Sequence, residues 1–296
     1  MTTQQTEPVA LGRVGIWSME LRGGDRGEVA DAAAELDEAG WGALWIPGAG
    51  APGIWEDADH LLDSTERTSV ALGVASIWGP DGDGAALAFP RLTARHGNRL
   101  LAGFGVSNPH SAAAAGRSFG SALSAMNSYL DSLDAASPPL PAGHRVLAAL
   151  GPRMVELAGR RASGVHPFLV TPESSQATRQ ALGPGAIIAP HQAVVLDTDA
   201  DRAREIARSG IGMYIGFASY QANLRRLGFT DADVVPGGSD GLIDQVVAWG
   251  TVEDVVRRVE AHHQAGADHV ALQVLTGHGR LPREEWRELS AALATR

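Results

Sequence analysis

The sequence contains no cysteine, and its 24 basic residues are all arginine, so lysine is absent as well. Without cysteine the chain forms no disulfide, thiolate nucleophile, iron–sulfur cluster or cysteine-ligated zinc site. Without lysine it forms no Schiff base, which excludes pyridoxal-phosphate enzymes, lysine-type aldolases and Walker-type phosphate loops. Any chemistry must therefore come from carboxylate, histidine, hydroxyl or amide groups, or from a bound cofactor.

Excess positive charge and long apolar runs are also missing. The 34 acidic and 24 basic residues give a net charge of −10, which argues against nucleic-acid or anionic-membrane partners. No apolar run approaches the roughly 18 residues of a membrane helix, and residues 1–10 do not resemble a signal peptide. We therefore expect a cytoplasmic protein with a single domain over residues 1–296, in which residues 1–10 form a disordered tail.

The chain alternates short β-branched runs with longer segments of helical period. Helices are expected between the runs, with Pro152 at the first position of one and Thr251 and Asp254 as the capping box of another. Such alternation predicts an α/β fold, a (β/α)8 TIM barrel with a helical insert after strand seven, and an open doubly wound sheet is the alternative. The strands are expected at residues 13–18, 43–48, 70–78, 100–107, 145–150, 165–170, 186–196 and 269–275.

In such a barrel the functional site lies at the C-terminal ends of the strands. Asn108 and His110 follow the fourth strand and His166 begins the sixth, so these three are the candidates for polar contact with a substrate. A metal-assisted hydrolase would need several ligands at the strand ends, where only the two histidines are well placed. Elsewhere, Glu56 and His60 have the spacing of a helical surface pair.

Two turns and three aromatic residues add to this picture. Gly103 and Gly105 resemble the opening of a dinucleotide-binding turn, but Asn108 replaces the third glycine and we expect no helix after it. The turn at residues 150–153 joins a strand to a helix, which suits either a phosphate or an ordinary connection. Trp17, Trp45 and Trp78 stand near strand ends, where they either pack in the core or face a flat ligand.

Taken together, these segments resemble a subgroup of the bacterial-luciferase-like flavin-dependent oxidoreductases, the subgroup assigned to the deazaflavin coenzyme F420. The resemblance extends from Leu11 to Leu275. It rests on the order of the segments LGRVGIW (11–17), ALWIP (43–47), LGVASIW (72–78), LAGFGVS (101–107), LAALGPRM (147–154), GVHPF (164–168), RLGFT (226–230) and AGADHV (265–270).

The resemblance implies that the barrel binds the flavin-type ring of F420, or alternatively of FMN, above the strand ends. It also implies a cytoplasmic homodimer. It places a non-prolyl cis peptide at Ala75-Ser76, behind the ring. The cofactor-binding residues that it implies are Trp17, Ala75, Ser76, Gly105, Ser107, Leu150, Gly151, Pro152 and Arg153. Because lysine is absent, the acidic cofactor must be held by arginines and backbone N–H groups, with Arg153, Arg160, Arg161, Arg225 and Arg226 as candidates.

The sequence departs from better-known F420 enzymes of this superfamily at two positions. Their histidine after strand two and glutamate after strand four correspond to Ala49 and Asn108, neither of which is a general acid. We expect an oxidoreductase that exchanges hydride with a small organic substrate. The alternatives are an FMN-dependent monooxygenase that uses O2 and a partner reductase, and a flavin-binding barrel without catalytic activity.

Overall fold

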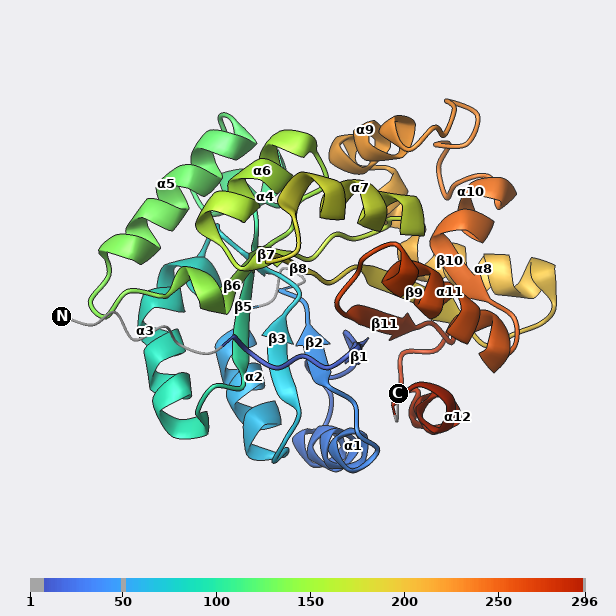
Figure 1. Cartoon of the computed structure of the whole chain (residues 1–296), viewed down its shortest axis with the longest axis horizontal. Coiled ribbons are helices and arrows are strands. Elements are labelled where there is room, and N and C mark those ends of the chain that lie inside the picture. The colour runs from blue at the N-terminus through green and yellow to red at the C-terminus, as the bar shows by residue number, and fades with distance from the viewer. Residues whose placement is uncertain (1–7, 49–51, 295–296) are drawn as a thin grey trace.

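The computed structural model describes residues 8–48 and 52–294 of the chain. Parallel strands lie in the centre and helices surround them (Figure 1). The strands are β1 (Val14–Trp17), β2 (Ala43–Ile46), β3 (Ser69–Leu72), β4 (Ala75–Ser76), β5 (Leu100–Gly105), β6 (Arg145–Leu147), β7 (Gly164–Val165), β8 (Ile187–Ile188), β9 (His191–Val195), β10 (Val247–Trp249) and β11 (Val270–Val274). The helices are α1 (Arg26–Glu38), α2 (Ile54–Asp63), α3 (Pro80–His96), α4 (Pro109–Ala114), α5 (Ala122–Ala135), α6 (Pro152–Arg161), α7 (Pro172–Leu182), α8 (Ala200–Ile215), α9 (Ala218–Arg226), α10 (Asp240–Val246), α11 (Val252–Gln264) and α12 (Arg283–Leu293), with a 3-10 turn at Ala142–His144.

The sheet closes into a barrel through one bent strand. β8 pairs with β7, and β9, which follows β8 after only Ala189 and Pro190, pairs with β11. Backbone hydrogen bonds from Ala189 N to Val165 O (3.0 Å) and from Asp268 N to Ile188 O (2.9 Å) join both neighbours to this strand. Because β11 also pairs with β1, the ring is complete, and the predicted TIM barrel is confirmed.

Local sequence signals place several helices as predicted. Pro152 begins α6, where its missing N–H leaves no hydrogen bond unmade. Thr251 and Asp254 form the capping box of α11, and Val255 and Val259 of the same helix are buried. The insert after the seventh strand contains α8, α9 and α10.

Three parts of the prediction were wrong. The third strand is interrupted between β3 and β4, and β10 lies in a segment for which only helices were expected. Residues 8–10, assigned to a disordered tail, pack against the barrel: Val9 is buried, and Ser69 Oγ donates a hydrogen bond to the carbonyl of Ala10 (2.7 Å). Burial of Val9 in the barrel interior supplies the apolar contact that orders this segment.

Aromatic rings fill the interior of the barrel. Trp45 is fully buried and stacks on His166 at a centroid distance of 4.2 Å, while its Nε1–H donates to His269 Nε2 (2.9 Å). Phe168 stacks on His191 at 3.8 Å, and Trp17 contacts both rings. The interior is therefore a packed core that includes indole and imidazole nitrogen atoms. Trp45 belongs to that core and not to the barrel mouth.

Arg145, the first residue of β6, holds the outer layer together from a buried position. Only 2% of its side chain is exposed, and it donates hydrogen bonds to Asp134 Oδ1 (2.6 Å), Arg161 O (2.8 Å) and Leu140 O (3.3 Å). We predict that Arg145→Met lowers the free energy of unfolding by about 2–4 kcal/mol, because a buried and a part-buried carbonyl lose their charged donor. Urea denaturation measures the change. The control, Arg160→Met, removes an exposed pair with Glu156 and should cost less than about 0.5 kcal/mol; equal losses would contradict the prediction.

Candidate functional site

The interruption of the third strand contains the non-prolyl cis peptide, at Gly73-Val74 and not at the predicted Ala75-Ser76. Ala75 and Ser76 instead form β4 and pair in regular register with Phe104 and Gly105. Gly73 has no room for a side chain, because a Cβ there would lie 2.9 Å from both His166 Nε2 and Trp17 Nε1. Trp17 Nε1–H donates to the carbonyl of Gly73 (2.8 Å), so this predicted cofactor-binding residue holds the interruption in place.

Val74 is a residue of this site that the sequence analysis missed. Its two methyl groups lie over the inner faces of Gly103 and Gly105, where added Cβ atoms would come within 2.9 and 2.8 Å of them. The glycines of β5 therefore accommodate Val74, and the cofactor contact of Gly105 stays a prediction. Val74 is half-buried at the C-terminal end of the barrel and offers an apolar surface there.

The three residues predicted to contact a substrate are not brought together. Asn108 is the N-cap of α4, a helix we did not expect, and its Oδ1 accepts from Ser111 N (3.0 Å). His110 is exposed on α4, and Ser107, with φ at 55°, pairs its hydroxyl with that of Ser111 (2.9 Å). Ala49 lies outside the described residues. The segment after β5 therefore contributes a helix cap to the barrel mouth.

His166 lies inside the barrel and is fully enclosed. Its Nδ1–H donates to the carbonyl of Ala189 (2.7 Å), while Nε2 has no partner among the described residues. Burial lowers the pKa of His166 to about 4, so the ring is neutral at physiological pH. A neutral, enclosed ring can accept a hydrogen bond, but it does not reach solvent or an exposed metal ion.

The predicted phosphate turn has free donors around it. Gly151 is the N-cap of α6 and provides no side chain to cap the helix, and Arg153 makes no hydrogen bond or ion pair with any described residue. Arg226, the last residue of α9, places Nη2 3.5 Å from the carbonyl of Leu150 and would be 3.6 Å from a Cβ on Gly151. The other candidate arginines are ion-paired: Arg160 with Glu156, Arg161 with Asp131 and Asp134, and Arg225 with Asp231.

Aromatic side chains from the helical insert extend from this end of the barrel. Tyr214 of α8 lies 4.8 Å from the Phe168 ring, and Tyr220 of α9 lies 6.1 Å from it. Phe217 joins them, so that Phe168 links the insert to Trp17. Burial raises the pKa of both tyrosines, which keeps their hydroxyls protonated as hydrogen-bond donors. Trp78 lies apart from this group, against Phe119.

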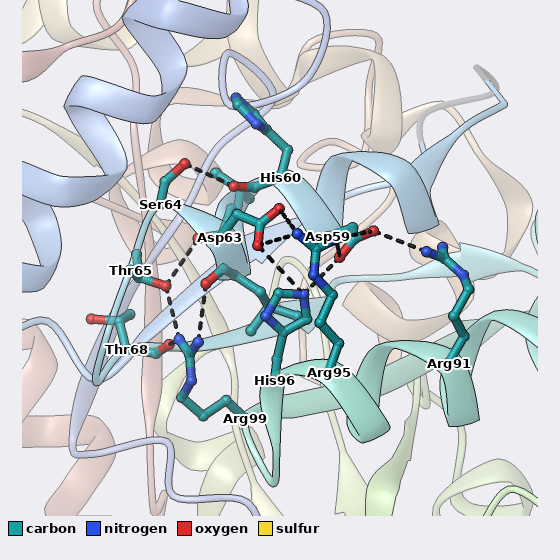
Figure 2. Close-up of polar contacts among 12 residues, drawn as sticks. Asp59, His60, Asp63, Ser64, Thr65, Thr68, Arg91, Arg95, His96 and Arg99 are labelled. Carbon is teal, nitrogen blue, oxygen red and sulfur yellow. Dashed lines mark hydrogen bonds and ion pairs between the residues drawn. The ribbon is translucent and has the colours of Figure 1, made fainter.

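Among the described residues, one group of potential metal ligands occurs outside the barrel mouth, between α2 and α3. Figure 2 shows Asp59, Asp63 and His96 facing Arg91 and Arg95. Arg95 donates to Asp63 (2.7 Å) and Asp59 (3.3 Å), and His96 Nε2 lies 2.6 Å from Asp59. The arginines already neutralise these carboxylates, so the cluster is an ion-pair network that joins two helices. His110 is exposed on α4 and His166 is enclosed in the barrel, so these two described histidines do not face one exposed metal site.

His60 and Glu56, the other candidate pair, also do not meet. His60 Nε2 bonds to the carbonyl of Arg26 (2.8 Å).

No family model matches the sequence, and no curated protein matches it. Solved structures match over nearly the whole chain. An F420-dependent secondary alcohol dehydrogenase in complex with an F420-acetone adduct superposes with a TM-score of 0.73 at 12% identity, covering 96% of this chain and 99% of that one. The coenzyme F420 dependent tetrahydromethanopterin reductase from Methanopyrus kandleri gives 0.71 at 16%, with 96% and 98% covered. The oxygenating constituent of 3,6-diketocamphane monooxygenase from Pseudomonas putida, in complex with FMN, gives 0.65 at 14%, with 94% and 96% covered. The chain therefore has the barrel fold that these F420-dependent enzymes and FMN monooxygenases share, as the sequence resemblance predicts.

Proposed function

We propose that the protein is an oxidoreductase that binds F420, or alternatively FMN, at the C-terminal end of the barrel and acts there on a small organic substrate. One observation carries the proposal. An apolar platform, Val74 on the interrupted third strand, and a turn with unpaired cationic donors, Leu150 to Arg153 with Arg226, occur at the same end of one barrel. A flavin-type cofactor combines a flat ring with a phosphate, which needs both features.

The residues present fit such a cofactor. Val74, held over Gly103 and Gly105, would support one face of the ring, and Trp17 fixes Gly73 behind it. The N–H groups at the start of α6 and the nearby guanidinium groups would bind the phosphate, since a helix N-terminus carries partial positive charge. The bound group would supply hydride transfer, which no side chain of this protein provides.

The protein itself would orient the substrate and exclude water. Tyr214 and Tyr220 offer hydroxyl donors beside an apolar wall that includes Phe168. We infer a small organic substrate that packs against aromatic rings, because the ring contacts of Phe168 are with Trp17, His191, Tyr214 and Tyr220. Tyr220 is then a candidate for positioning the substrate.

Two alternatives give different results in the same experiment. An FMN-dependent monooxygenase requires O2 and a partner reductase, whereas F420-dependent transfer does not require O2. A flavin-binding barrel without activity would bind the cofactor and turn over no substrate.

We predict that the purified protein binds one of F420 and FMN in preference to the other, with a perturbed absorbance spectrum. Because arginines and a helix N-terminus would hold the phosphate, the affinity should fall as salt is raised from low to moderate concentration. Absorbance titrations at two salt concentrations measure both effects. Failure to bind either compound at any salt concentration would overturn the proposal.

A further inference from the structure

The helical insert contributes a second buried polar group beside the phosphate turn. Asn223 of α9 is 4% exposed, and its Oδ1 accepts a hydrogen bond from Arg226 Nη2 (3.2 Å). Its Nδ2 is buried and has no hydrogen-bond partner among the described residues. A buried amide donor without an acceptor is costly, typically by about 1–3 kcal/mol, so an unpaired Nδ2 calls for an acceptor from outside the chain.

The same Arg226 nitrogen connects this amide to the turn. Nη2 contacts Asn223 Oδ1 and also lies 3.5 Å from Leu150 O, at the limit of a hydrogen bond. Figure 1 shows α9 and α6 on the same side of the barrel, and this contact joins them across 76 residues of sequence. Arg226 therefore brings a guanidinium to the start of α6 from a different part of the chain, and Asn223 lies beside that guanidinium.

The charges around this point are unusual for the protein. Most arginines of the described chain pair with a carboxylate, including Arg225, the neighbour of Arg226, which pairs with Asp231 (2.8 Å). Arg226 and Arg153 have no carboxylate partner in the part of the chain that the structure describes. Two guanidinium groups without a described carboxylate partner, a helix N-terminus without a side-chain cap and a buried amide N–H group all supply hydrogen-bond donors.

We propose that α9 completes the phosphate site of the cofactor, with Arg226 and the Nδ2 of Asn223 binding phosphate oxygens that the N-terminus of α6 also contacts. The inference rests on the proposed function, and it adds that the insert, and not the barrel alone, distinguishes a phosphorylated cofactor from its phosphate-free form. Guanidinium and amide groups can do this without lysine, because a guanidinium binds phosphate through paired N–H donors.

The test compares compounds that differ only in the phosphate part. FMN is compared with riboflavin, and F420 with its phosphate-free deazaflavin, by fluorescence titration of the wild-type protein. We expect the phosphorylated form to bind at least about tenfold more tightly. Arg226→Gln and Asn223→Asp should each reduce that preference by about tenfold or more while leaving the affinity for the phosphate-free form unchanged. The matched control Arg225→Gln should keep the full preference.

Each other outcome is decisive. If a flavin compound binds but Arg226→Gln keeps the wild-type preference, the role of α9 is overturned and the proposed function stands. If inorganic phosphate binds without competing with FMN or F420, the site belongs to another ligand and the assignment to the cofactor is overturned. Should Asn223→Asp fail to fold by circular dichroism, Arg226→Gln decides alone, because that side chain is exposed.

If no flavin compound binds, the proposed function fails and the anion site is tested separately. Phosphorus NMR of inorganic phosphate should then show line broadening with the wild-type protein that Arg226→Gln abolishes. No broadening with the wild-type protein overturns the site as well.

Discussion

Acidification from pH 7.5 to pH 5 is expected to remove most of the stability of the protein. Burial lowers the pKa of four histidines: His166 and His269 to about 4, and His191 and His262 to about 3. Their pKa in the unfolded chain is near 6.5, so below that pH the unfolded chain binds protons that the folded chain does not. Stability is therefore complete above pH 6.5 and is lost as the pH falls towards 4.

The hydrogen bonds explain why these rings stay neutral. His269 accepts from Trp45 Nε1–H and donates through Nδ1 to Gly12 O (2.9 Å), so a second proton would oppose the tryptophan N–H. His191 donates through Nε2 to Gln273 Oε1 (2.8 Å), so a second proton on its buried Nδ1 would find no acceptor among the described residues. Each histidine contributes about 2 kcal/mol between pH 7.5 and pH 5, and together they approach the whole stability of a typical domain.

Urea midpoints at pH 7.5 and pH 5 measure the effect, and we expect the second to be less than half the first. His269→Gln, which keeps an acceptor and a donor but does not titrate, should flatten the pH dependence. His110→Gln, which changes an exposed ring, should leave it unchanged. Equal midpoints at the two pH values would contradict the prediction. Carboxylates with lowered pKa values do not account for a difference, because they titrate below this range.

Gly103→Ala is expected to destabilise the fold strongly. Its Cβ would lie 1.9 Å from the backbone oxygen of Leu72 and 2.9 Å from Val74 Cγ1. A backbone oxygen cannot move aside as a side chain can, so β3 and the Val74 platform must shift together. We predict a loss of at least about 3 kcal/mol in the free energy of unfolding, or failure to fold.

The control is Gly84→Ala on α3, where nothing lies within 4 Å of the added Cβ. Alanine there should raise stability by up to about 1 kcal/mol, because glycine disfavours a helix interior. Urea denaturation of both variants measures the difference. A Gly103→Ala protein as stable as the wild type would show that β3 and β5 approach less closely than described.

Most of the barrel could be predicted because its signals are local. Alternating strand and helix periods, Pro152 at the start of α6 and the capping box of α11 depend on residues close in sequence. β10 could not be predicted in this way, because Val247–Trp249 is only three residues long and directly follows the apolar end of α10. Its composition predicts that the helix continues. Pairing with β9 makes it a strand, and that pairing is a long-range contact.

The candidate site likewise contains residues that local sequence predicts and residues that depend on long-range contacts. The turn at Leu150 to Arg153 is a local strand-to-helix connection and was found from the sequence. Val74 and Asn223 were not, because their importance depends on what they touch: glycines on another strand, and an arginine that reaches a turn 76 residues away. Asn108 was assigned a role that its local geometry instead gives to helix capping.

By itself, the absence of lysine determined that an acidic ligand must be held by arginine, amide and backbone N–H groups. Only the tertiary structure decided which arginines near the turn have no carboxylate partner among the described residues. Arg161 follows the turn in sequence, but carboxylates of α5 occupy its guanidinium, whereas α9 brings Arg226 to the turn without a carboxylate. The physical reason is that an ion pair depends on which elements pack together in space, and spacing along the chain does not record it.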